Sequence, residues 1–243
     1  MKSSRCYREP MHATRLGLAA ALIWFTATVA SAHHGKDFLI VESYDLPHPW
    51  DVYFVSSAAF ANLDDDAAVE LEPSLLIGVL PRLAFELHAH TAKEPNESFR
   101  YEATAPSLHF QVTPPDNTFP VRVGLSAEYE FAAHNAVHDR AEVRLILESG
   151  FGKHKAVANI IGAHENGKRS EAAYAAGYRY EFTDQFAGGI EGQGPITADG
   201  IHEAILGLYY EPTERITLKL GVGSVFDRDD VHLIARLGTV FRF

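Results

Sequence analysis

Two histidines on one expected strand face are the first candidates for chemistry in this 243-residue chain. His88 and His90 are separated by one residue, and Glu86 lies two residues before His88. Alternate side chains of a strand point to the same side, and two imidazoles with a carboxylate can ligate a transition metal. The same residue types also line polar interiors, which is the role we expect here. We therefore predict no cofactor and no metal, with His88 and His90 as the candidates should a metal bind.

Other residues with chemical capacity lack the partners that catalysis or metal binding needs. His33 and His34, at the N-terminus expected after export, can bind copper but have no third ligand in the sequence pattern. His164 and Ser170 lie six residues apart across an expected loop, so a Ser–His pair from separate strands stays open as an alternative. The single cysteine, Cys6, excludes an internal disulfide. We predict that the chain is not an enzyme.

The first 32 residues have the features of a secretory signal. Four basic residues accompany an apolar run over 16–30, which ends in Ala30-Ser31-Ala32. A signal peptidase recognises small residues at these positions. We therefore expect a signal peptide over 1–32, cleaved before His33, with either Met1 or Met11 as the start.

The charge of the chain excludes one class of partner. The formal net charge is −11, and the expected cleavage leaves 17 Lys and Arg against 31 Asp and Glu. Such a chain has no basic surface for phosphate, so we expect no nucleic-acid partner. No stretch after the signal reaches 18 consecutive apolar residues, so the sequence predicts no transmembrane helix.

Alternation with period two, which is typical of strands, runs through the rest of the chain. Residues 33–49 are of mixed character, and we expect a periplasmic lead-in or a partial plug there. Residues 50–243 divide into twelve expected strands, with ten as the alternative count; the fourth changes phase near Pro106, where we expect a bulge. The expected strands are 50–61, 67–79, 82–92, 99–112, 119–131, 140–151, 154–164, 170–182, 185–192, 201–210, 214–225 and 230–243.

The connections between these strands alternate between tight turns and longer or more polar loops, and aromatic residues gather near the strand ends. Both features are typical of outer-membrane barrels. The sequence therefore predicts an all-β, transmembrane, antiparallel up-and-down barrel in the outer membrane of a Gram-negative bacterium. An even number of strands places both termini on the periplasmic side, where the turns are short.

The last expected strand ends in Phe241-Arg242-Phe243, with apolar residues at alternate positions. This ending resembles the assembly signal of outer-membrane barrels, which implies Phe241 and Phe243 as that signal and the barrel assembly machinery as a partner. The segments 71–78, 82–87 and 177–180 resemble the meta-pathway of phenol degradation family of outer-membrane transport-like barrels. That resemblance implies movement of small molecules, with aromatic ones among the candidates, and supplies no catalytic residue.

Charged residues on the faces opposite the apolar ones must avoid hydrocarbon, so we expect them to line the interior. Acids outnumber bases among them, which predicts that an open pore favours cations. The expected lining residues are Glu70, Glu72, Glu86, His88, His90, Arg122, Glu128, Glu130, Glu142, Arg144, Glu148, Arg179, Glu181, Lys219 and Arg236.

The sequence favours a barrel that allows passage or facilitated uptake of an unidentified small solute through a charged lumen. Two alternatives stay open. One is a structural or binding barrel whose interior is plugged, because mixed charges can pair and close a lumen. The other is a lipid-modifying enzyme. The known twelve-stranded phospholipases carry a His-x-Ser motif, which does not occur after residue 32.

Overall fold

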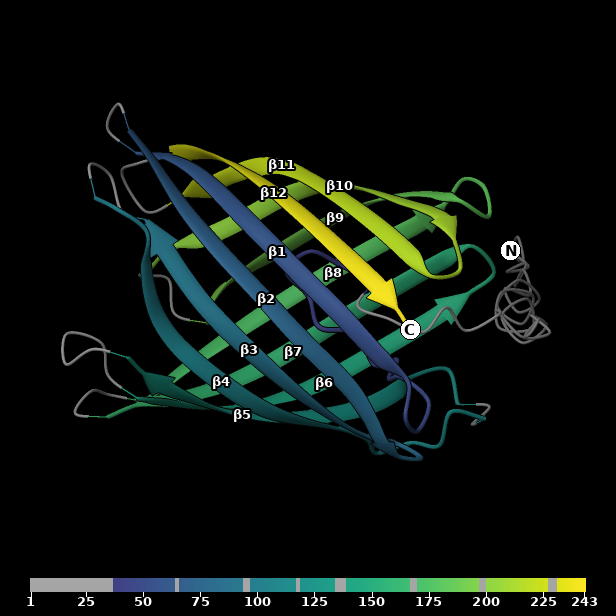
Figure 1. Ribbon diagram of the computed structural model, residues 1–243. Helices are drawn as coiled ribbons and strands as arrows, with labels where there is room; N and C mark the ends of the chain where they lie inside the picture. The colour runs from purple at the N-terminus through teal and green to yellow at the C-terminus, as the bar shows by residue number, and fades with distance from the viewer. Residues whose placement is uncertain are drawn as a thin grey trace, which may run out of the picture.

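The computed structural model describes residues 37–63, 66–93, 97–116, 119–133, 139–166, 170–196, 200–226 and 231–243. These residues form a closed barrel (Figure 1). The predicted signal peptide at 1–32 lies outside the described residues, as do His33 and His34. The strands are β1 (Val52–Leu63), β2 (Asp66–Leu80), β3 (Leu83–Lys93), β4 (Arg100–Gln111), β5 (Arg122–Ala132), β6 (Arg140–Phe151), β7 (His154–Glu165), β8 (Glu171–Glu181), β9 (Phe186–Pro195), β10 (His202–Thr213), β11 (Ile216–Phe226) and β12 (Val231–Arg242).

Each strand pairs antiparallel with its neighbours in the sequence, and β1 pairs with β12 to close the sheet. The closure runs from Tyr53 opposite Arg242 to Ala61 opposite Ile234. The predicted twelve-stranded antiparallel barrel is confirmed, and the alternative of ten strands is wrong. Among the described residues, no helix is long and apolar enough to span a membrane.

The two ends of the barrel differ in the same way as the predicted connections. β1 begins and β12 ends at the end of the barrel that carries the turns β2–β3, β6–β7 and β10–β11 (Figure 1). We call this the tight-turn end, and we call the opposite one the loop end. That the tight-turn end faces the periplasm stays a prediction.

Two details of the predicted strands differ from the structure. The register irregularity on β4 lies at Glu102, between the pairs His90–Ala103 and Thr91–Tyr101, and not near Pro106. From Ala103 to Gln111 the inward positions alternate without interruption, so Pro106 falls on the outward set. β5 begins at Arg122, later than expected, which makes the β4–β5 connection longer than a tight turn.

The outer face of the barrel is apolar over its middle. Leu208, Leu220 and Leu237 lie side by side on β10, β11 and β12, and each side chain is about half exposed. Aromatic side chains are exposed near both ends, among them Phe151 and Phe182 at the tight-turn end, with Tyr101 and Phe131 at the loop end. An apolar band between two aromatic girdles fits a bilayer and its two headgroup layers.

The chain before β1 enters the barrel. Residues 37–49, which we call the inner segment, run inside the barrel near the tight-turn end (Figure 1). Pro49 pairs with Gly78 of β2, and the Trp50 amide donates to the Gly78 carbonyl at 2.7 Å. A Cβ on Gly78 would lie only 2.0 Å from the His48 carbonyl oxygen, so only glycine lets the inner segment cross β2 here.

We predict that an outward charge at mid-height destabilises the membrane-inserted barrel. Leu220 lies in the middle of β11, and Leu220→Arg should cost roughly 2–4 kcal/mol because hydrocarbon cannot solvate a guanidinium. Leu233→Arg, at an exposed position near the loop end of β12, should cost about 0–1 kcal/mol. Urea titrations of both variants in lipid vesicles measure the difference; equal losses would contradict a lipid-facing band at Leu220.

We predict that the last residue matters for insertion. Phe243 is 78% exposed, and its amide donates to the Val52 carbonyl at 3.0 Å, which ties the chain end to β1. Phe243→Ala should lower the amount of inserted barrel, whereas Val231→Ala, an exposed apolar position at the other end of β12, should not. The band shift between heated and unheated gel samples reports the folded fraction. Equal folded fractions would show that Phe243 is not an assembly signal.

Candidate functional site

One buried carboxylate on β9 holds the backbone of the inner segment. The amides of Leu39, Ile40 and Val41 donate to the Glu191 carboxylate at 2.9, 2.8 and 3.1 Å. The Tyr209 hydroxyl of β10 donates to the same carboxylate at 2.6 Å. Glu191 is 1% exposed, so its carboxylate has lost its bound water. The three amides and the hydroxyl supply the hydrogen bonds that the water would have made. Successive amides turned toward one anion form an anion-binding concavity.

Three further hydrogen bonds continue the attachment along the inner segment. The Glu42 amide donates to the Asn159 side-chain oxygen at 2.9 Å, and the Asn159 amide group donates to the Glu42 carbonyl at 3.0 Å. The Tyr44 amide donates to Glu148 at 2.9 Å. The inner segment thus bonds to the wall through wall side chains in place of a strand ladder.

Ion pairs fix the acids of the inner segment near the tight-turn end. Asp45 lies 2.9 Å from the Lys155 ammonium and 3.1 Å from the Arg122 guanidinium. Asp37 contacts Lys155 and lies 3.7 Å from Arg179. Burial alone would raise the pKa of the Asp37 carboxyl, but the Lys155 and Arg179 cations outweigh burial and hold the pKa below its ordinary value of 3.8.

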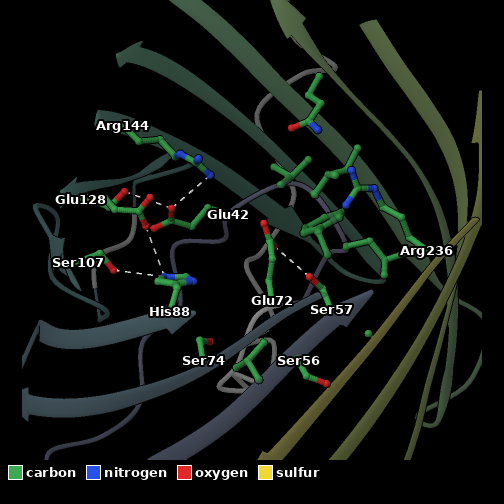
Figure 2. A pocket seen from close by; sticks show the side chains of 18 of the residues that line it. Glu42, Ser56, Ser57, Glu72, Ser74, His88, Ser107, Glu128, Arg144 and Arg236 are labelled. Atoms are coloured by element: carbon green, nitrogen blue, oxygen red, sulfur yellow. Dashed lines mark hydrogen bonds and ion pairs between the residues drawn. The ribbon is translucent and has the colours of Figure 1, made fainter. Parts of the chain in front are cut away.

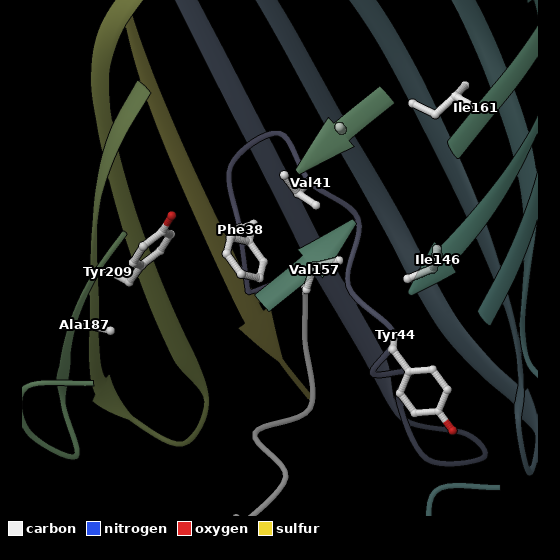
Figure 3. Packing of buried hydrophobic residues seen from close by; sticks show 9 residues of the cluster. Phe38, Val41, Tyr44, Ile146, Val157, Ile161, Ala187 and Tyr209 are labelled. Atoms are coloured by element: carbon white, nitrogen blue, oxygen red, sulfur yellow. The ribbon is translucent and has the colours of Figure 1, made fainter. Parts of the chain in front are cut away.

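Apolar contacts complete the seat of the inner segment. Phe38, Val41 and Tyr44 pack against inward side chains that include Val157 of β7 and Tyr209 of β10 (Figure 3). The Phe38 and Tyr209 rings meet edge to face, with centroids 6.1 Å apart. The wall therefore carries an apolar patch inside the lumen where the inner segment covers it.

A cavity of about 350 Å³ lies on the loop-end side of the inner segment (Figure 2). Residues 38–42 form its floor, and the other lining residues come from nine strands. Those are Val55, Ser56, Ser57, Glu70, Glu72, Ser74, His88, His90, Ser107, His109, Ser126, Glu128, Glu142, Arg144, Gln193, Lys219, Arg236 and Gly238. The volume is enough for a small polar molecule with its hydration.

Most cationic groups of the cavity are engaged by acids or carbonyls. Arg236 makes two hydrogen bonds to Glu203, at 2.5 and 2.8 Å. Lys219 donates to the Phe38 carbonyl at 2.7 Å. Arg144 contacts Glu142 at 2.7 Å and Glu42 at 3.3 Å. Among the described residues, no hydrogen bond or ion pair to the Glu70 carboxylate is found, so this acid is available to the cavity.

The histidines of the cavity lie beside acids. His88 lies 3.3 Å from Glu86 and 3.5 Å from Glu128, and His90 lies 3.3 Å from Glu72. Within the described part of the chain, no three or more His, Cys, Asp or Glu side chains are grouped to hold a metal ion. Ser170 and His164 do meet, at 3.1 Å on the rim of the loop end. No described acid or amide contacts that imidazole to orient it as a base would need.

The predicted interior residues fall into four groups. Nine line the cavity: Glu70, Glu72, His88, His90, Glu128, Glu142, Arg144, Lys219 and Arg236. Arg122, Glu148 and Arg179 contact the inner segment instead. Glu86 is buried beside the cavity with Ser74 and His109. Glu130 and Glu181 are half-buried, near the loop end and the tight-turn end respectively, and do not line the cavity.

The sequence interpretation missed Lys155, Asn159 and His109 as interior residues that contact the inner segment. Lys155 and Asn159 share a face of β7 with Val157 and Ile161, while the opposite face is also apolar. Neither face is therefore distinguished by polarity. The available signal was the spacing of Lys155 and Asn159, four residues apart on one side of an extended strand.

No family model matches the chain, and no curated protein matches it. Several solved structures of outer-membrane barrels do match the chain. The KdgM porin superposes with a TM-score of 0.60 at 12% identity, covering 79% of this chain and 99% of that one. The COG4313 outer membrane channel from Pseudomonas putida F1 gives 0.59 at 11% identity, covering 82% and 97%. Outer membrane phospholipase A from Escherichia coli gives 0.51 at 13% identity, covering 79% and 93%. At these identities the likeness shows a shared barrel fold.

We predict that Asp37 stabilises the seated inner segment in a pH-dependent way. Asp37→Asn leaves the half-buried Lys155 with Asp45 and Glu148 as its remaining acids and should weaken the seat by roughly 1–3 kcal/mol. Because the folded-state pKa of Asp37 is lowered, this contribution is complete above its ordinary value of 3.8 and is lost as the pH falls through the folded-state pKa.

Hydrogen exchange of the peptide 37–45 measures this prediction. Exchange in Asp37→Asn should exceed exchange in the wild type at pH 7, and the two should converge in strong acid after correction for intrinsic rates. A difference that persists unchanged to pH 2 would show that the charge of Asp37 does not hold the segment.

Proposed function

We propose that the chain is an outer-membrane barrel that passes small polar solutes through its lumen, with a preference for cations. One observation carries the proposal: a hydrophilic cavity of about 350 Å³ lies inside a closed barrel whose outer face is apolar. The folds of the KdgM porin and the COG4313 channel support the same class of function. A core that serves stability alone is close-packed and holds few voids larger than a water molecule.

The net charge of the cavity depends on which of its acids are paired with bases. Arg144 is shared by two glutamates, and Arg236 is bound to Glu203. The Glu70 carboxylate has no such partner among the described residues and contributes negative potential to the lumen. Rings of acids favour cations in pores. A solute with an ammonium or guanidinium group, or a hydrated metal cation, fits this electrostatic environment.

The export route and the family are parts of the same proposal. The features of 1–32 support a signal peptide cleaved before His33. The terminal Phe241 and Phe243 support recognition by the barrel assembly machinery. The segments 71–78, 82–87 and 177–180 support membership of the meta-pathway of phenol degradation family, whose label suggests small aromatic solutes. An aromatic cation would satisfy both this label and the acids of the cavity.

Two other functions have a specific observation in their favour. The seated inner segment favours a plugged barrel with a structural or binding role. The contact of Ser170 with His164, and the fold shared with a phospholipase, favour a lipid-modifying enzyme. Both readings predict a purified barrel that carries no solute flux, and only the second predicts hydrolysis of phospholipid that Ser170→Ala abolishes.

We predict that acids of the cavity set ion preference. In the paired variant Glu70→Gln with Glu128→Gln, the cation-to-anion permeability ratio should fall several-fold, because two carboxylates leave the lumen without a change in side-chain size. Reversal potentials of single barrels in a planar bilayer, recorded across a salt gradient, give this ratio.

Glu214→Gln is the matched control, since Glu214 is exposed in the β10–β11 turn and lies outside the cavity. It should leave the ratio unchanged. If the paired variant conducts with the wild-type ratio, these acids do not select the solute. A wild-type barrel that inserts and conducts at no voltage would overturn the passage function and leave the plugged barrel.

A further inference from the structure

We propose that the cavity is a binding site for solutes that carry a primary ammonium or a guanidinium group, and that it recognises their N–H donors as well as their charge. The proposal rests on the proposed passage function and names the class of solute within it. It follows from the hydrogen-bond capacity that remains in the cavity once its own side chains are paired. Two cations of equal charge and size, one rich and one poor in N–H donors, should therefore bind there with different affinities.

Hydroxyl groups of the cavity donate their hydrogens to acids of the wall and of the inner segment. Ser57 of β1 donates to Glu72 of β2 at 3.0 Å (Figure 2). Ser126 of β5 donates to Glu42 at 3.1 Å. A hydroxyl group has one hydrogen to donate and two lone pairs that accept. With their hydrogens engaged in this way, both serines offer a solute only acceptor oxygens.

Nitrogen donors of the lining are engaged in the same way. The Gln193 amide group donates to Glu203 at 2.9 Å, and Arg236 makes its two hydrogen bonds to the same carboxylate. The Lys219 ammonium donates to the Phe38 carbonyl at 2.7 Å. The side-chain oxygen of Gln193 remains as an acceptor. The described lining therefore offers more acceptors than donors to a solute.

Glu70 supplies a charge that can anchor the cation. Ala59 of β1 lies opposite Glu70 of β2 on one side and opposite Arg236 of β12 on the other. The guanidinium of Arg236 is turned to Glu203, so this base, one strand away from Glu70, is already occupied. The Glu70 side chain is exposed to the cavity, and no ion pair to it is found among the described residues. A cation can therefore pair with Glu70 without breaking a described contact of the wall.

The number of N–H donors then decides how well a cation fits this lining. A tertiary or quaternary ammonium covers its charge with alkyl groups, so the oxygens that it displaces from water receive few or no hydrogen bonds in return. A primary ammonium carries three donors, and a guanidinium group carries five. Hydrogen bonds between charged groups are about twice as strong as those between neutral groups. Donor-rich cations therefore recover the hydrogen bonds that the acceptors of the cavity lose on binding.

Two isomeric cations test the recognition of donors. Isopropylammonium and trimethylammonium have the same atoms and the same charge, but the first carries three N–H donors and the second carries one. The conductance of single wild-type barrels in a planar bilayer is recorded against the concentration of each cation. The concentration of half-maximal conductance measures its binding in the lumen. We expect this concentration to be at least threefold lower for isopropylammonium than for trimethylammonium.

Replacement of Glu70 tests the anchor. Glu70→Gln keeps the side-chain shape, removes the charge and exchanges one acceptor oxygen for a donor group. The half-saturating concentration of isopropylammonium should rise at least threefold, and it should rise more than that of trimethylammonium, so the difference between the isomers narrows. Glu214→Gln is the matched control, because Glu214 is exposed in the β10–β11 turn and lies outside the cavity. It should keep the wild-type values for both cations.

The outcomes separate this binding site from the passage function. Equal half-saturating concentrations of the two isomers in the wild type would overturn the recognition of donors and leave passage intact. Barrels that conduct potassium but neither isomer would overturn the site for organic cations in the same way. A difference between the isomers that stays unchanged in Glu70→Gln would overturn Glu70 as the anchor. No conductance of any cation, from barrels that gel shift shows to be folded and inserted, would overturn passage and binding site together.

Discussion

Pairing of β1 with β12 is the constraint on which the other features depend. In hydrocarbon an unpaired backbone amide or carbonyl costs several kcal/mol, so a sheet can cross only if its last edge is closed. Closure fixes the register, with Val55 opposite Val240, and therefore decides which side of every strand faces out. The apolar outer band and the charged interior are both consequences of that one register.

The same register places charged side chains in the interior, where each needs an ion-pair partner or water. The barrel wall provides these in two ways. Near the loop end the acids and bases surround a cavity, whereas near the tight-turn end they bind the inner segment. The segment in turn has no strand to pair its amides, and the wall supplies Glu191, Asn159 and Glu148 as acceptors. Wall and segment each satisfy polar groups that the other would leave buried and unpaired.

The sequence was sufficient for the barrel and only partly sufficient for the site. β5 alternates strictly between apolar and polar residues, so the inward face of Glu128 follows from period two alone. On β12 the outward positions from Val231 to Leu237 are all apolar, which places Arg236 on the opposite, inward face. β7 could not be assigned in this way, because Val157 and Ile161 point inward to meet the inner segment. The contact of Phe38 with Tyr209 joins residues that are far apart in the chain. A pattern within one strand cannot predict such a contact.

The charge of the lumen depends on where the inner segment lies. When seated, it brings Asp37, Glu42 and Asp45 into the barrel, where they pair with Lys155, Arg122, Arg179 and Arg144. Without it, those wall cations retain Glu148, Glu211 and Glu142 as their recorded partners. The lumen near the tight-turn end would then become less negative, while Glu70 and Glu72 would still line the cavity on the loop-end side. The position of the inner segment therefore sets the charge that a solute meets along the lumen.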